Sequence, residues 1–310
     1  MKVYTEINFL TNISFFISEA IDKNENLLLE LLKLKNFLKS NDIKEIILLD
    51  KNNALVYPEE LREYISRKDA RNLSSKEELV KIENINFSYP FCYFFLLNNN
   101  EAITEKNKIQ LNLDSLEKDC ENLFSDMSKN PKVDFNNWTN FTNCFKILPT
   151  NSIIVCDNFL FKNKQHNIKE LLKKLLLNSN YRNEIDITLI CGQEYTYDEL
   201  KRHWDSIYDI LQKDLKIKKF NLCVVKKLNK DYHDRHIFTD YQVFESGNSF
   251  SMYFNVSTTL HCIPYSMNNQ DNKTKFSHYY NSLLEIKSIL SKLNTNDYVG
   301  SLSNKLVDCI

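Results

Sequence analysis

The chain has 310 residues, and its 40 basic and 41 acidic side chains leave a formal net charge of −1. This length suits one large domain or two of ordinary size. A hydrophobic content of 43% with 12% aromatic residues is typical of a folded protein and excludes a largely disordered one. The balanced charge excludes a global polycation, so any site for nucleic acid or another polyanion must be local.

Eight cysteines are scattered along the chain without a CxxC pair. Cys156, Cys191 and Cys223 lie in apolar runs typical of buried strands, where a free thiol behaves as a small hydrophobic group. We therefore expect a reduced, cytoplasmic protein. At the N-terminus, Glu6 and Asn8 interrupt the apolar run and no small-residue cleavage site follows, so we expect no signal peptide.

The first half of the chain alternates helical and extended patterns. Leucines at helical spacing predict an amphipathic helix over 25–40, and apolar runs predict strands over 43–50 and 90–97. Two further helices are expected over 58–70, where proline suits the first turn, and over 114–127. This pattern indicates an α/β or α+β fold.

The first glycine of the chain is Gly192, so the first half cannot contain a glycine-rich loop of the kind that cradles nucleotide phosphates. A polar, irregular stretch over 130–151 marks the expected domain boundary. We expect residues 1–145 to form a separate N-terminal domain, whose role the sequence does not indicate.

Beyond this boundary the pattern becomes regular. Strands are predicted over 152–161, 184–192 and 219–227, and the helices between them over 167–179 and 197–216. Strand–helix–strand units at these spacings imply right-handed crossovers. We therefore expect a largely parallel sheet with helices on its faces.

The next two apolar segments, 236–244 and 250–257, are predicted to form a hairpin in which Gly247 and Asn248 supply the turn. We assign the second domain to residues 150–267.

Residues 268–310 are expected to lie outside that domain. A polar stretch over 268–275 indicates a linker, and the pattern over 280–293 predicts a last helix.

The stretch DYHDRH, residues 231–236, is the strongest candidate for a functional site, because it groups histidine, arginine and aspartate side chains. On a strand, His233 and Arg235 share one face, while Asp234 and His236 share the other. An imidazole beside a guanidinium at the end of a parallel sheet suits a phosphate site, because the imidazole attacks phosphorus or transfers a proton and the planar cation grips two oxygens. The alternative is a polar hairpin with a surface ion pair.

Five further residues extend this candidate site. Asp240 can orient a histidine, and Gly247 with Asn248 can let a ligand approach the backbone. Asp157, at the end of the first strand of the second half, lies where ligands bind in such sheets, although it can equally cap the next turn. Lys230 ends the basic run KKLNK, which can attract a polyanion.

The spacing His233-x-Arg235-x4-Asp240-x6-Gly247-Asn248 resembles the His-x-Lys-x4-Asp-x6-Gly motif of the phospholipase D superfamily, with arginine where lysine is usual. The HDR form is particularly similar to the phospholipase D-like domain that follows microtubule-interacting-and-trafficking domains, and to bacterial relatives.

The resemblance covers roughly residues 150–265 and includes the order of strands and helices before the motif. It implies a phospholipase D-like, mixed and largely parallel sheet with helices on both faces. Members of the superfamily that hydrolyse phosphodiesters place two such motifs across a two-fold axis. This chain has one motif, and its six histidines all lie at or beyond His166, so the resemblance implies a homodimer that brings two His233 side chains together.

By the same resemblance, His233 is the nucleophile or acid–base group, Arg235 the phosphate clamp and Asp240 the orienting carboxylate, with Gly247 and Asn248 forming the pocket wall. No metal and no other cofactor is expected. The function implied is a phosphodiesterase or nuclease, and the resemblance to bacterial relatives suggests a role in a conflict or antiphage module. The alternative is a degenerate module that binds nucleic acid, a membrane surface or a protein partner without turnover.

Overall fold

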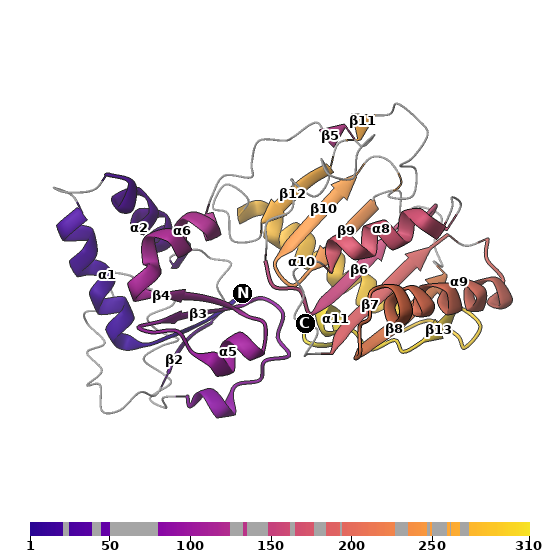
Figure 1. Cartoon of the computed structure of the whole chain (residues 1–310), viewed down its shortest axis with the longest axis horizontal. Coiled ribbons are helices and arrows are strands. Elements are labelled where there is room, and N and C mark those ends of the chain that lie inside the picture. Colours follow the sequence, from indigo (N-terminus) through magenta and orange to yellow (C-terminus); the bar gives the residue numbers. More distant parts are fainter. Residues whose placement is uncertain are drawn as a thin grey trace. The chain divides into compact units, whose positions relative to one another are not determined.

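The computed structural model divides the chain into two compact units (Figure 1). The N-terminal unit contains Met1–Asp126 and Asn268–Ser277, and the C-terminal unit contains Met127–Met267 and His278–Ile310. The structure describes residues 1–20, 25–38, 45–49, 80–124, 133–134, 148–161, 165–176, 184–192, 194–226, 235–246, 249, 259–260, 262–266 and 273–310.

A four-stranded sheet forms the centre of the N-terminal unit. Its order is β2-β1-β3-β4, and every neighbouring pair is parallel. The strands are β1 (Lys2–Thr5), β2 (Glu45–Leu48), β3 (Cys92–Leu96) and β4 (Ile109–Asn112). All five residues of β3 are buried, as expected for a central parallel strand covered on both faces. The predictions of β2, β3 and an α/β class for this half are confirmed.

Helices cover this sheet because strand residues alternate between two apolar faces. On one face Tyr4 stacks on Phe94 at a ring-centroid distance of 4.9 Å, and on the other Phe9 stacks on Phe95 at 5.7 Å. The longer helices are α1 (Ile7–Ala20), α2 (Glu25–Leu38) and α6 (Leu116–Phe124), and the short ones are α5 (Glu101–Glu105), η1 (Ile82–Asn84) and η2 (Leu113–Ser115).

The helices predicted over 25–40 and 114–127 are therefore confirmed as α2 and α6. Sequence patterns gave no indication of β1 or β4, which are only four residues long. The helix predicted over 58–70 lies outside the described residues.

A seven-stranded mixed sheet forms the centre of the C-terminal unit, in the order β12-β10-β9-β6-β7-β8-β13. The strands are β6 (Ser152–Cys156), β7 (Ile185–Cys191), β8 (Phe220–Lys226), β9 (Arg235–Thr239), β10 (Gln242–Ser246), β12 (Cys262–Ser266) and β13 (Tyr298–Gly300). Only the pairs β6–β7 and β7–β8 are parallel. A mixed sheet is confirmed, but "largely parallel" describes only its centre, because the chain adds antiparallel strands on both sides. A separate two-residue pairing joins β5 (Val133–Asp134) to β11 (Thr259–Leu260).

Helices lie on both faces of this sheet, as predicted (Figure 1). The strands β6, β7 and β8 follow one another in one direction, so right-handed crossovers place α8 (Gln165–Leu175) and α9 (Tyr197–Asp209) on the same face. A single π-type turn, Ile210–Asp214, ends α9. On the opposite face lie α11 (Lys305–Asp308) and the part of α10 (Lys273–Leu290) that belongs to this unit, from His278 onward. The ring of Tyr279 on α10 contacts the ring of His236 there.

The C-terminal segment departs from the sequence interpretation. Residues 268–310 were expected to form a linker and an appended helix, but β13 pairs with β8 and α11 packs against β6. The side chain of Asn304 fixes this segment, because its amide donates to the carbonyl of Ile153 at 3.2 Å and to the hydroxyl of Thr188 at 3.1 Å. Most of this segment therefore belongs to the C-terminal unit.

The hairpin was also predicted at the wrong place. Segment 236–244 is not one strand, because β9 ends at Thr239 and β10 begins at Gln242. Asp240 and Tyr241 form the two-residue turn, closed by a bond from the Gln242 amide to the Thr239 hydroxyl at 3.1 Å. The partner of β10 on its other side is β12. Residues 250–257, the expected second strand, lie outside the described residues.

Two general expectations, on membrane spans and on the cysteines, can be compared with the structure. Among the helices that the structure describes, none is long and apolar enough to cross a bilayer. The thiols of Cys92, Cys120, Cys156, Cys191 and Cys223 are buried and none of these five is paired in a disulfide, as expected for a protein that uses cysteine as a small apolar side chain.

Candidate functional site

The candidate site lies where the carboxyl ends of β6 and β7 meet the start of β9. Strand β9 runs antiparallel to β6, with His236 opposite Cys156. Arg235, the first residue of β9, therefore lies beside Asp157, the residue that follows β6. Ligands of open α/β sheets bind outside the carboxyl ends of the parallel strands, which is the edge that these two residues occupy.

Asp157 is held by three different groups. Its side chain is fully buried, and Oδ1 lies 3.7 Å from Nε of Arg235. The same oxygen accepts from the backbone amide of Phe159 at 2.9 Å, while Oδ2 accepts from the Ser249 hydroxyl at 2.6 Å. The carboxylate thus caps the turn after β6, which is one of the two roles that the sequence allowed, and it also faces a cation. Its role in binding a ligand stays a prediction.

Arg235 is a largely buried cation whose orientation is set from two sides. Its side chain is 18% exposed. The carbon at the centre of the guanidinium lies 5.3 Å from the ring centroid of Phe159, in addition to the ion pair with Asp157. A guanidinium fixed by a carboxylate and an aromatic face loses less freedom when it binds an oxyanion than a mobile surface arginine does.

Gly192, the first glycine of the chain, lies at this edge, where a close backbone approach requires glycine. A Cβ placed on Gly192, directly after β7, would lie 2.7 Å from the carbonyl oxygen of Asn158. The loops that follow β6 and β7 therefore approach each other more closely than any other residue at this position would allow. This contact holds the turn that carries Asp157 and Phe159 against the end of β7.

Aromatic side chains continue the site along α9. The rings of Phe161 and His203 stack at 4.1 Å with an angle of 9°, and Tyr195 meets His203 edge-on at 5.2 Å. Burial raises the pKa of Tyr195 to about 12, with smaller contributions from nearby anions that include Asp157. Burial also lowers the pKa of His203, so its imidazole is neutral at pH 7.

Sequence reasoning selected neither Tyr195 nor His203 as a site residue. Both follow the carboxyl end of β7, and a capping box between Thr196 and Glu199 starts α9 between them. Their position after that strand was the signal that could have associated them with the same edge. Ser249, next to the predicted Asn248, was also missed.

Asp240 does not belong to this edge, which corrects the prediction that grouped it with Arg235. Its fully buried carboxylate accepts from the backbone amides of Asn151 at 2.6 Å and Ser152 at 2.9 Å, at the beginning of β6. Five residue-to-residue steps of extended chain lead from Arg235 to Asp240, which corresponds to roughly 16 Å. Because β9 runs antiparallel to β6, its two ends lie at opposite ends of that strand.

Of the other predicted site residues, His233, Lys230, Gly247 and Asn248 lie outside the described residues. The predicted separation of Arg235 from His236 by face is confirmed. His236 is buried on the α10 side, where its ring lies 5.4 Å from that of Phe238.

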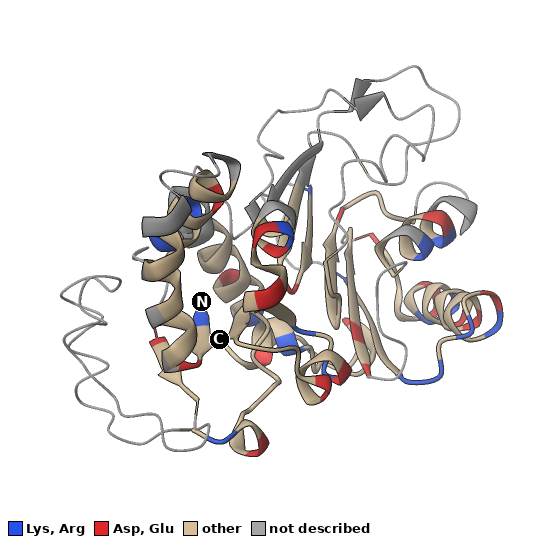
Figure 2. Ribbon diagram, turned by 60° about the vertical axis from the view of Figure 1, so that its left-hand side comes forward, with Lys and Arg blue, Asp and Glu red and all other residues tan. Residues whose placement is uncertain are grey.

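Basic residues on the helices are largely neutralised by their neighbours. Figure 2 shows Lys and Arg interspersed with Asp and Glu along α9. Lys201 pairs with Asp205 at 3.2 Å, and Lys213 pairs with Asp209 at 3.0 Å. These exposed pairs indicate a solvated helix face and not a track for a polyanion.

The described part of this edge combines one oriented guanidinium, one buried carboxylate, a hydroxyl and several aromatic rings. This arrangement can hold an anion, and within the described residues no cluster of three or more His, Cys, Asp or Glu side chains is placed to bind a metal ion. Comparison with known proteins adds no assignment: no protein-family model matches the chain, and no curated protein is detectably similar to it.

Proposed function

We propose that the C-terminal unit binds a phosphodiester beside Arg235 and cleaves it as a homodimer, with nucleic acid as the favoured substrate. The observation that supports this proposal is the Asp157–Arg235 ion pair of 3.7 Å at the carboxyl edge of the sheet. The likeness of the motif to that of the phospholipase D superfamily supplies the roles of the residues.

The chemistry follows from two side chains at alternate positions. His233 lies two residues before Arg235, the spacing that places side chains on one face of an extended segment. The guanidinium offers a planar set of N–H donors to two phosphate oxygens, and Asp157 fixes its plane. The imidazole of His233 then attacks phosphorus, so that a P–N bond forms as the ester P–O bond breaks.

The leaving oxygen needs a proton, which His233 of the partner subunit supplies in this proposal. Water then attacks the phosphohistidine, and the partner subunit's His233 accepts a proton from that water as the P–N bond breaks. The cycle consumes one water and needs no metal or redox cofactor. In Asp240's place, Asp157 becomes the orienting carboxylate, and it acts on Arg235 and not on a histidine.

One observation favours a second candidate, a module that binds an anionic surface or a protein partner without turnover. Arginine stands where lysine is usual in the motif, and its charge is already balanced by Asp157 within the chain. Arginine holds phosphate but does not reproduce the geometry of a lysine ammonium. The reduced, cytoplasmic setting expected from cysteine usage, and a role in a bacterial conflict or antiphage module, fit either candidate.

One set of assays distinguishes the two candidate functions. The purified full chain is mixed with labelled single-stranded DNA, duplex DNA, RNA and phospholipid vesicles, and both binding and cleavage are measured. We expect wild-type protein to cleave a nucleic acid, His233→Ala to bind it without cleavage, and Arg235→Gln to bind it more weakly.

Binding without cleavage by both wild-type protein and His233→Ala establishes the non-enzymatic module instead. If wild-type protein neither binds nor cleaves any of the four, both candidates are wrong. Sedimentation of the same preparations tests the homodimer.

A further inference from the structure

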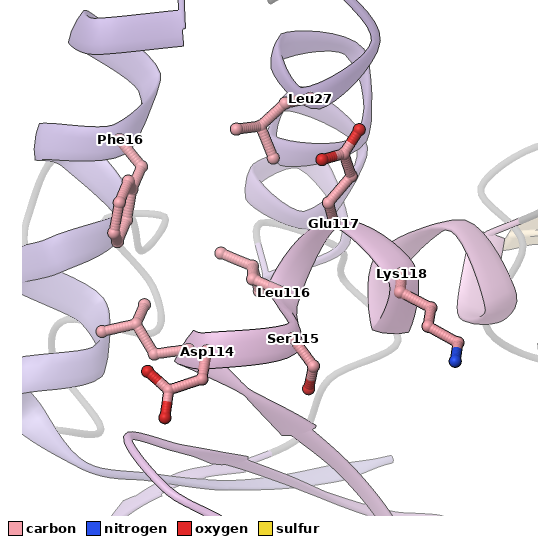
Figure 3. A pocket seen from close by; sticks show the side chains of 8 residues that line it. Phe16, Leu27, Asp114, Ser115, Leu116, Glu117 and Lys118 are labelled. Carbon is pink, nitrogen blue, oxygen red and sulfur yellow. The ribbon is translucent and has the colours of Figure 1, made fainter.

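The N-terminal unit contains a pocket of about 560 Å³ between α1, α2 and the start of α6 (Figure 3). It is lined by Phe16, Leu27, Leu113, Asp114, Ser115, Leu116, Glu117 and Lys118. The volume lies within the range of pockets that enclose a ligand or an anchoring group. It is independent of the phosphate site, because all of its lining belongs to the other unit.

The pocket exists because two apolar helix stripes extend beyond the packed core. On α1, Phe16 follows the fully buried Phe9 and Ile13 at helical spacing, and on α2, Leu27 precedes the fully buried Leu31. Phe16 and Leu27 are only half-buried, and Figure 3 shows their side chains on opposite sides of the open space. The apolar core between α1 and α2 is therefore open at the end where Phe16 and Leu27 lie.

Apolar surface also continues outside the pocket. The ring of Phe15 is 57% exposed and meets Phe16 edge-to-face at a centroid distance of 6.1 Å. An apolar pocket beside an exposed aromatic ring is typical of a surface that another chain covers.

The rim of the pocket is acidic. Asp114 and Glu117 are exposed, and in Figure 3 the carboxylate of Glu117 rises beside Leu27 while the ammonium of Lys118 points away from the space. Neither carboxylate lies in an ion pair among the described residues. An occupant with positive charges around an apolar anchor would complement this rim.

We propose that this pocket receives a large apolar side chain from a basic amphipathic helix of a partner protein. The helix-in-groove mode uses apolar residues at helical spacing to fill such a space, and lysines beside them would lie near Asp114 and Glu117. The pocket takes one anchor, and the apolar surface around Phe15 extends the contact along the helix.

A second copy of this chain is a poorer fit. The lysine-rich helix α8 has the right charge, but its apolar residues Ile168, Leu171 and Leu172 are already buried in the core of the C-terminal unit. The same is true of Leu200 and Ile207 on α9. Among the described helices, the basic ones thus have no apolar face left to offer.

The test uses a defined probe: a fluorescein-labelled peptide of leucine and lysine, about 14 residues or four helical turns long, with leucines at i, i+3, i+4 and i+7. Its binding to the full-length protein is measured by fluorescence anisotropy. Two control peptides carry glutamate in place of lysine, or the same leucines and lysines in scrambled order. We expect only the amphipathic basic peptide to bind.

Variants then locate the site. Asp114→Lys combined with Glu117→Lys should weaken binding by about tenfold or more, because both rim charges are reversed. Glu101→Lys is the matched control, since Glu101 is also an exposed glutamate in the first turn of a helix of the same unit, and its binding should not change. Leu27→Trp fills the pocket and should abolish binding without lowering the thermal stability.

Three results would overturn the proposal. The first is wild-type protein that binds the scrambled or the glutamate peptide as well as the basic amphipathic one. The second is unchanged binding in the folded Asp114→Lys/Glu117→Lys variant or in Leu27→Trp. The third is saturable binding of dodecylammonium with no binding of the peptide, which would make the occupant a small organic cation.

Discussion

Two buried aspartates lie at opposite ends of the β6–β9 pair, and they differ in what holds them. Asp240 accepts short hydrogen bonds from the backbone amides of Asn151 and Ser152, at the beginning of β6, and a longer one of 3.5 Å from the Asn151 side chain. Asp157 faces the Arg235 side chain, the Ser249 hydroxyl and one turn amide. A carboxylate bonded mainly to backbone stabilises a fold, whereas one bonded to side chains orients groups that a ligand can also contact.

The largest expected effect is the loss of stability when Asp240, the aspartate bonded to backbone, is replaced. Asp240→Ala removes the acceptor of the Asn151 and Ser152 amides and leaves buried donors unsatisfied, so it should lower the free energy of unfolding by about 3 kcal/mol. Urea unfolding measures the loss. Under conditions where the variant is folded, its affinity for a labelled oligonucleotide should equal that of wild type. A loss of affinity with no loss of stability would place Asp240 back in the site.

At the other end, Asp157→Ala should cost less stability, about 2 kcal/mol, because Arg235 is partly exposed and can turn towards solvent when its partner is lost. Here the affinity for the oligonucleotide should fall along with the stability, by a similar factor to that seen in Arg235→Gln. Anisotropy titrations of both variants check this. Unchanged affinity in Asp157→Ala would show that Arg235 does not depend on its carboxylate.

A double-mutant cycle compares the two ends directly. Asp157 and Arg235 are in contact, so their combined substitution should show a coupling free energy of about 1 kcal/mol. Asp240 and Arg235 are separated by roughly 16 Å, and their effects should add to within about 0.5 kcal/mol. Chemical unfolding of wild type, the three single variants and the two double variants gives both numbers. Equal coupling at the two ends would contradict the arrangement of β9.

These contacts show which parts of the structure can be predicted from the sequence. Strands β7 and β8 were predicted because their apolar runs are continuous, as in any sheet covered on both sides. The hairpin was misplaced because its turn residues, Asp240 and Tyr241, are both fully buried and contain no glycine. Apolar alternation therefore continued through a point where the chain reverses.

The candidate site was predictable only to the level of which strand ends meet. The topological rule brings Asp157 to the edge where β9 begins, and the motif spacing identified Arg235. The role of Asp240 depended on amides 88 and 89 residues away in the sequence, a pairing that no local pattern records. Strand β13 and helix α11 escaped prediction for the same reason, because β13 exists only as a partner of β8.

A third buried aspartate extends the comparison to pH and gives the smallest expected effect. Asp186 lies at the start of β7, where its carboxylate accepts from the Lys305 amide at 2.9 Å and from the Asn221 side chain at 2.9 Å. Burial raises the pKa of Asp186, although the Lys305 ammonium at 3.3 Å acts in the opposite direction.

Because the folded-state pKa is raised, the stability that this group contributes is present below the unfolded-state pKa and is lost as pH rises through the folded-state value. Asp186→Asn removes the titration while it keeps a polar group in place. The variant should therefore be least stable relative to wild type at about pH 4 and should approach wild type as the pH rises towards 7. Urea unfolding of both proteins across this range measures the difference. A deficit that grows with pH would instead mean that the pair with Lys305 outweighs burial, making Asp186 an anchor of the C-terminal helix that depends on its charge.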